Sequence, residues 1–153
     1  LFAVATELGA LFNGASEALL GALRSFGLRL GTAYQIYDDC LDLAGSETRA
    51  GKTLGTDLRR GKLTLPILHL LQTSSPAERA SLGSLILEGR EAEMRALVSK
   101  ALDTGAVRFA VATGRTMLSE ARDQLRELPE SVYRAALENL CITLDSMFAP
   151  LDR

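Results

Sequence analysis

The chain has 153 residues, 47% of them hydrophobic, and a formal net charge of −2 at pH 7. This length fits one ordinary domain with a sizeable core, and the composition is not that of a disordered chain. The charge balance also lacks the basic footprint of a nucleic-acid-binding protein, so no nucleic-acid partner is expected.

The first residues of the chain are apolar and have helical periodicity, with Leu1, Leu8 and Phe12 on one face. They lack a basic leader and include Glu7, which is untypical of a signal peptide, and they are too few to span a bilayer. We expect no transmembrane segment. Because the chain starts without Met and inside a helical pattern, we also expect it to be a piece of a longer protein.

The remaining sequence also has helical periodicity, without convincing alternating runs that would indicate strands. Its breaks contain proline, glycine or capping residues, as at Ser75-Pro76 and Gly89. We predict helices over residues 1–13, 16–44, 76–88, 90–103, 106–127 and 130–148, and a short one that starts near Pro66. The predicted fold class is all-α.

Two glycines, Gly27 and Gly31, stand one turn apart inside the long helix predicted at 16–44. Each costs about 1 kcal/mol relative to alanine in a helix interior. Two interpretations stay open: a tight crossing with another helix, or room for a substrate beside the acidic residues that follow.

An acidic stripe lies near the C-terminal end of the same predicted helix. Its members share one side of the helix because they are spaced at i, i+3, i+4 and i+7: Gln35, Asp38, Asp39 and Asp42. Buried carboxylates about 6 Å apart repel by roughly 3 kcal/mol at an effective dielectric of 20, so a buried stripe needs cations. An oxygen-only ligand set favours Mg²⁺ together with substrate phosphates. A solvated acidic patch is the alternative.

Other functional motifs fit poorly. Residues 45–53 resemble a nucleotide P-loop, but the spacing is wrong by one residue and no strand precedes it. The aspartates also lack the alternation of an EF-hand. His69, the only histidine, lies on an apolar helix, so a packing role is expected. Cys40 and Cys141 lie far apart, which favours free buried thiols and a cytoplasmic protein.

A basic, glycine-punctuated loop follows the acidic stripe over residues 45–64. Glycines allow the backbone to approach an anion closely, and Lys and Arg side chains bind phosphate oxygens. Two patterns run through this region: Gln35-x-x-Asp38-Asp39-x-x-Asp42, then Gly51-Lys52-Thr53-x-Gly55-x-Asp57-Leu58-x-x-Gly61-Lys62-x-Thr64-Leu65-Pro66. Together they resemble the second aspartate-rich motif and the following loop of the trans-isoprenyl diphosphate synthases, the polyprenyl synthetase family.

This resemblance implies a fold and a site. The implied fold is the isoprenoid-synthase-type helical bundle around a central cavity. Residues 1–153 look like its C-terminal half, with the metal and diphosphate segment at 34–66. The implied cofactor is Mg²⁺, with Asp38 as a direct ligand and catalytic residue, and with Asp39 and Asp42 completing the site partly through water.

Substrate-binding residues follow from the same resemblance. Lys52 is similar to the catalytic lysine that binds the allylic diphosphate. Gln35 is similar to a polar neighbour of that site, and Lys62 to a further substrate-binding residue. Asp57 is expected to support the loop.

The implied activity is that of a prenyltransferase in isoprenoid biosynthesis, which condenses isopentenyl diphosphate with an allylic diphosphate and acts as a homodimer in its full-length form. The family's first aspartate-rich motif and its arginine pair are missing from this sequence, so the chain alone is expected to be inactive. Two alternatives stay open: a non-catalytic helical subunit that modulates a partner synthase, and a terpene cyclase-like enzyme, whose second metal motif usually mixes Asn, Ser and Glu.

Overall fold

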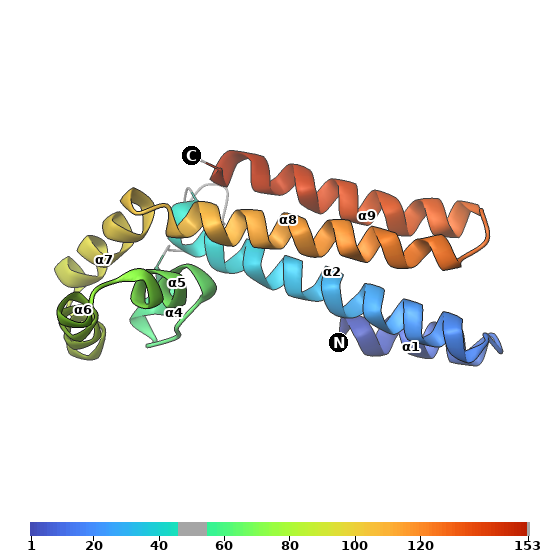
Figure 1. The fold of residues 1–153 in the computed structure, drawn as a ribbon, viewed down its shortest axis with the longest axis horizontal. Helices are drawn as coiled ribbons and strands as arrows, with labels where there is room; N and C mark the ends of the chain where they lie inside the picture. The colour runs from blue at the N-terminus through green and yellow to red at the C-terminus, as the bar shows by residue number, and fades with distance from the viewer. Residues whose placement is uncertain (46–54, 153) are drawn as a thin grey trace. The chain divides into compact units, whose positions relative to one another are not determined.

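A computed structural model describes residues 1–45 and 55–152 of the chain. All regular elements in these residues are helical, which confirms the all-α prediction (Figure 1). They are α1 (Phe2–Phe12), α2 (Glu17–Ala44), α4 (Thr56–Arg59), α5 (Leu65–Thr73), α6 (Pro76–Glu88), α7 (Glu91–Asp103), α8 (Ala106–Gln124) and α9 (Val132–Phe148), with the 3₁₀ helices η1 (Leu125–Glu127) and η2 (Ala149–Leu151). In the described part of the chain, no helix combines the length and the apolarity needed to cross a membrane.

Local capping signals set several helix ends. The Ser75 hydroxyl accepts the Glu78 N–H at 3.3 Å, and the Glu78 carboxylate accepts the Ser75 N–H at 3.1 Å, which is a capping box at the start of α6. Gly89 ends the same helix in the left-handed conformation, with φ 66°. The helix predicted at 76–88 is therefore confirmed at both ends.

No helix is predicted from the sequence between residues 45 and 64, so α4 is a correction. With four residues, α4 is too short to produce helical periodicity. Its N-cap residue is Gly55, which has φ 71° and contributes no capping side chain. The group that caps this helix comes from α2 and is described with the site below.

The chain divides into two compact units, and α2 and α8 each contribute to both. The first unit contains Leu1–Gln35 and Thr113–Ala149. The second contains Ile36–Ala112 and Pro150–Arg153.

In the first unit, α1 crosses α2 closely. The Thr6 hydroxyl donates to the Leu23 carbonyl at 2.6 Å. A methyl group at Gly27 would lie 2.6 Å from the carbonyl oxygen of Phe2, and one at Gly31 would lie 2.9 Å from the Phe2 side chain. These contacts confirm the tight-crossing interpretation of the two glycines.

The helices α8 and α9 lie side by side in the same unit (Figure 1). Gly114 of α8 faces the fully buried ring of Phe148 in α9, and a methyl group there would lie 2.5 Å from that ring. Arg115 pairs with Asp145 across the two helices at 3.4 Å. A missing side chain and a buried aromatic ring thus set the close approach of α8 and α9.

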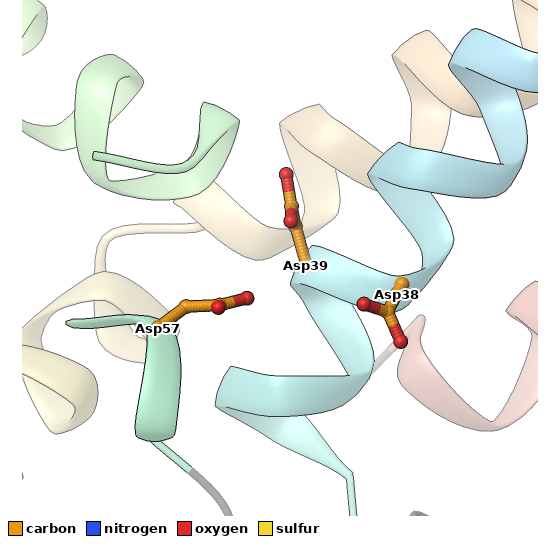
Figure 2. A group of neighbouring side chains, drawn as sticks. All are labelled: Asp38, Asp39 and Asp57. Carbon is orange, nitrogen blue, oxygen red and sulfur yellow. The ribbon is translucent and has the colours of Figure 1, made fainter. Parts of the chain in front are cut away.

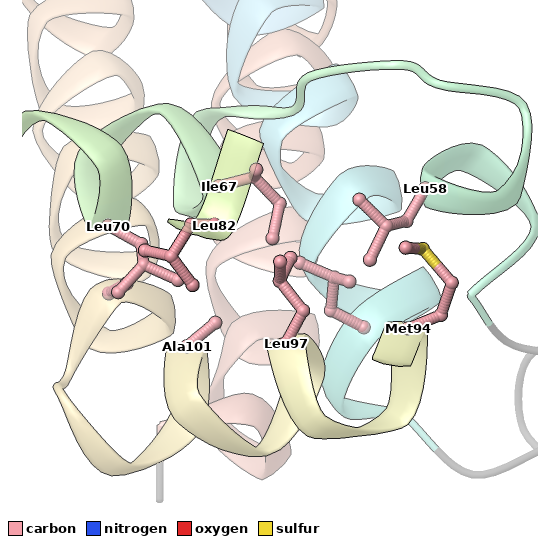
Figure 3. Close-up of a cluster of buried hydrophobic side chains, with 9 residues drawn as sticks. Leu58, Ile67, Leu70, Leu82, Met94, Leu97 and Ala101 are labelled. Atoms are coloured by element: carbon pink, nitrogen blue, oxygen red, sulfur yellow. The ribbon is translucent and has the colours of Figure 1, made fainter. Parts of the chain in front are cut away.

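The second unit has a core of buried apolar side chains from several helices (Figure 3). These are Leu43, Leu58, Ile67, Leu70, Leu82, Met94, Leu97, Ala101 and Ala106. Leu43 lies in α2 and Leu58 in α4, so this core holds together the two helices that carry the acidic residues of the site. His69 of α5 stacks on Phe109 of α8 with ring centroids 3.8 Å apart, which confirms a packing role for the histidine.

Candidate metal and diphosphate site

Three carboxylates from two helices meet in the second unit. Asp38 and Asp39 lie in α2 and Asp57 lies in α4, and Figure 2 shows Asp57 pointing toward the turn of α2 that carries the other two. One carboxylate oxygen of each residue lies within 4.8 Å of the others. The sequence predicts Asp38 and Asp39 as metal ligands but assigns Asp57 only to loop support. In the sequence, only the place of Asp57 in the loop pattern points to a functional role. The packing of α4 brings Asp57 close to Asp38 and Asp39.

Asp42 has a different environment. Its side chain is buried, with 1% of the residue exposed, and its carboxylate accepts the backbone N–H groups of Asp57 at 3.1 Å and Thr56 at 3.4 Å. Its carbonyl also accepts the Gly55 N–H at 2.8 Å. The first N–H groups of a helix lack partners inside the helix and attract negative charge. Asp42 therefore caps α4 and positions Asp57, and its role as a metal ligand stays a prediction.

Lys62 bridges two of the three carboxylates. Its ammonium donates to Asp39 Oδ1 at 3.2 Å and to Asp57 Oδ2 at 3.3 Å. Partial burial acts to lower the pKa of Lys62, but the hydrogen bonds and charges of Asp39 and Asp57 outweigh it and raise the pKa above its usual 10.5. Lys62 is therefore a cation at neutral pH.

Cys40 sits next to Asp39 and is fully buried. Burial, and secondarily the charge of Asp39, raises the pKa of the Cys40 thiol to about 12. The thiol is therefore protonated at neutral pH. Among the described residues, the neighbouring donor atoms that could hold a metal ion are carboxylate oxygens of Asp38, Asp39 and Asp57.

The structure does not test the predicted substrate-binding roles of Gln35 and Lys52. Gln35 is exposed on α2, one turn before Asp39. Lys52 lies outside the described residues. The substrate-binding roles of Gln35, Lys52 and Lys62 stay predictions.

The three aspartates fit a hard divalent cation. Mg²⁺ binds oxygen at about 2.0 to 2.1 Å, so oxygens on opposite sides of one ion lie about 4 Å apart. Three carboxylate oxygens within 4.8 Å of one another are close to that size, and small side-chain shifts or intervening waters would close the difference. The donor set and its spacing therefore suit Mg²⁺.

The sequence pattern of the family described as "Polyprenyl synthetase" matches residues 1–104. The chain belongs to this family. Membership confirms the resemblance that the acidic stripe and the following loop indicate, and the match contains both of them in full.

Two curated relatives in the family show how much of a family protein the chain represents. It is 37% identical over 146 residues to the octaprenyl diphosphate synthase of Haemophilus influenzae, a match that covers 92% of this chain and 43% of the relative. It is 34% identical over 137 residues to heptaprenyl diphosphate synthase component 2 of Bacillus subtilis, covering 90% of this chain and 39% of the relative. The chain thus spans about two fifths of the length of these relatives.

A solved structure in the family confirms the fold. The polyprenyl synthase of Caulobacter crescentus, solved with calcium and isoprenyl diphosphate, superposes on this chain with a TM-score of 0.82 and 34% identity. The match covers 99% of this chain and 45% of that one. The helical arrangement is therefore that of the isoprenyl synthases, while the central cavity stays a prediction.

Proposed function

We propose that the chain is the acidic, diphosphate-binding part of a Mg²⁺-dependent prenyltransferase that condenses isopentenyl diphosphate with an allylic diphosphate. The observation that carries this proposal is the meeting of Asp38, Asp39 and Asp57 beside Lys62 in a member of the polyprenyl synthetase family. Carboxylates bind hard cations and ammonium groups bind phosphate oxygens, so one site holds groups for both.

The proposed ligands of the metal are the three carboxylates of the acidic stripe, Asp38, Asp39 and Asp42, with Asp57 added by its position. When bound, Mg²⁺ supplies charge neutralisation for the diphosphate group. The Caulobacter protein is described with calcium and isoprenyl diphosphate, which supports a divalent cation and a prenyl diphosphate as ligands of this chain.

The proposed reaction breaks the C–O bond of the allylic diphosphate, and the electron pair leaves with the diphosphate. The double bond of isopentenyl diphosphate then forms a carbon–carbon bond with the allylic cation, and a proton is lost. The products are a longer prenyl diphosphate, diphosphate and one proton. In this proposal Lys52 and Lys62 stabilise negative charge on the leaving group, which is electrostatic catalysis without a protein nucleophile.

The two alternative functions have less support. The matched relatives carry the names of prenyl diphosphate synthases, which favours this proposal over a terpene cyclase. A purely structural subunit has no physical need for three carboxylates held this close together, because each must be balanced by a cation. The relatives are more than twice as long as the matched segment, so we propose that another segment supplies the rest of the active site.

Calorimetry tests the metal assignment. We expect Mg²⁺ to bind the chain weakly alone and more tightly when mixed with inorganic diphosphate, because Mg²⁺ releases water reluctantly and takes phosphate oxygens as co-ligands. Asp38→Asn should weaken the binding of Mg²⁺-diphosphate by about tenfold or more, since it removes a charge beside the ion.

The matched control is Asp123→Asn, because Asp123 lies on the surface of α8 and pairs with Arg126 at 2.9 Å. Its binding should equal that of the unmodified chain. Unchanged binding in Asp38→Asn, or tight binding of Mg²⁺ without diphosphate, would contradict the proposed function.

A further inference from the structure

The ammonium of Lys62 lies where a cation would bind. It contacts Asp39 and Asp57, two of the three residues whose carboxylate oxygens lie within 4.8 Å of one another. An ammonium group and a divalent cation that approach the same two carboxylates repel each other and compete for the negative charge there. The arrangement therefore implies competition between the side chain and the metal.

The Lys62 side chain is exposed enough to move away from the two carboxylates into solvent. It is 49% exposed, whereas the side chains of Asp39 and Asp57 are 10% and 20% exposed. Its two contacts, at 3.2 and 3.3 Å, are longer than the usual distance for charge-assisted hydrogen bonds. A half-exposed ammonium group that moves into water stays hydrated, and a divalent cation that binds Asp39 and Asp57 replaces the positive charge that these largely buried carboxylates would otherwise lose.

The backbone at Lys62 is held in place while the side chain can move. Gly61 has φ 72°, and its N–H donates to the Leu58 carbonyl at 2.9 Å. The Lys62 N–H donates to the Asp57 carbonyl at 3.0 Å. Rotation about side-chain bonds therefore moves the ammonium away from the carboxylates but leaves it within reach of the site.

We propose that Lys62 is the resident counter-ion of this site. Without metal it bridges Asp39 and Asp57, and it gives up both contacts when a divalent cation binds there. The ammonium then becomes available to an oxygen of the bound diphosphate. This inference rests on the proposed function, because it takes the group of three aspartates as the cation site.

Metal affinity without diphosphate tests the inference. Binding of Mn²⁺, a spectroscopic substitute for Mg²⁺, can be followed on the 153-residue chain by the electron paramagnetic resonance signal of the unbound ion. Lys62→Gln should bind Mn²⁺ about tenfold more tightly, because one positive charge about 6 Å from a divalent ion is removed. Lys62→Arg keeps the charge and should bind like the unmodified chain.

The matched control is Arg60→Gln, which removes the same charge from an exposed side chain two residues away. At physiological salt its affinity should change by less than about twofold, because exposed charges are screened. Equal or weaker Mn²⁺ binding in Lys62→Gln would overturn the counter-ion role. Unchanged Mn²⁺ binding in Asp39→Asn would instead show that the cation site, and with it the proposed function, is wrong.

The unmodified chain provides a second measurement, which needs no variant to fold. The sequence contains three lysines, Lys52, Lys62 and Lys100. Lys100 pairs with Glu78 at 3.2 Å. Acetylation with a water-soluble ester, read by mass spectrometry, should become faster at Lys62 when Mg²⁺ is added and stay constant at Lys100. Equal Lys62 rates with and without Mg²⁺, under conditions where Mg²⁺ binds, would overturn the proposal.

Discussion

The polar residues on one side of α2 have three environments, although their spacing is regular. Gln35 is exposed, Asp38 and Asp39 join Asp57, and Asp42 is buried against the start of α4. Spacing shows which side chains share a face, but the partner of each depends on the chain that packs over that turn. Asp42 is the clearest case, because its carboxylate has a structural use that needs no metal.

Substitution of Asp42 separates the structural role from the metal role. Asp42→Ala should lower the free energy of unfolding of the metal-free chain by about 1 to 3 kcal/mol, because the N–H groups of Thr56 and Asp57 lose a charged acceptor. Asp42→Asn keeps one acceptor oxygen and should have a smaller effect. Urea denaturation followed by circular dichroism measures both.

The control for this experiment is Asp123→Ala, a surface change that should stay within about 0.5 kcal/mol. If Asp42→Ala were as stable as the unmodified chain without metal, the capping role would be wrong. Metal binding would then be the main role left for this carboxylate.

At the level of elements, two glycines of α2 have opposite packing environments. Gly27 lies under α1, where a methyl group would meet the Phe2 carbonyl oxygen at 2.6 Å and the Ala3 Cα at 2.8 Å. Gly21 lies in the same helix, but a methyl group there would meet nothing within 4 Å. The cost of glycine in a helix is therefore offset by close packing at Gly27 and not at Gly21.

Alanine substitution at these two glycines should give changes of opposite sign. Gly27→Ala should destabilise the chain by about 1 to 3 kcal/mol, because the contacts it creates are with backbone atoms that must move. Gly21→Ala should stabilise it by up to about 1 kcal/mol through helix propensity. Thermal unfolding of both variants measures the change in stability. A stabilising effect of Gly27→Ala would contradict the close crossing of α1 and α2.

At the scale of the whole molecule, the exposed apolar side chains of α1 bear on how the chain associates. Its exposed apolar side chains include Phe2, Val4, Leu8, Leu11 and Phe12, the last 82% exposed. Full burial of a large apolar side chain contributes about 1.5 to 3 kcal/mol relative to full exposure, and a partly exposed one loses a fraction of this, against a whole-domain stability of about 5 to 15 kcal/mol. The chain also spans only about two fifths of its curated relatives, so we expect that surface to be covered by more protein.

We therefore predict that the chain alone self-associates and has no prenyltransferase activity. Sedimentation velocity should show species larger than the 16.4 kDa chain. Addition of a separately expressed segment with the family's first aspartate-rich motif should give a defined complex and Mg²⁺-dependent condensation of isopentenyl and allylic diphosphates. The Asp38→Asn chain should form the complex without the activity, whereas a stable monomer that turns over both substrates unaided would refute the prediction.

The sequence by itself determined the all-α class, most helix ends, the acidic stripe and the family. These features depend on short-range order: helical periodicity, capping at residues such as Ser75 and Gly89, and the fixed spacing of the loop pattern. Each of these features depends on residues that lie near one another along the chain, so it can be predicted without knowing how the helices pack.

Only the tertiary structure decided how the acidic residues are used. Asp42 and Asp57 are separated by 15 positions in the sequence. The hydrogen bond from the Asp57 N–H to the Asp42 carboxylate forms because the core holds α4 against the end of α2. The same packing brings Asp57 to Asp38 and Asp39 and places Lys62 between two carboxylates. Such contacts depend on which apolar side chains are buried together, and periodicity along one helix does not contain that information.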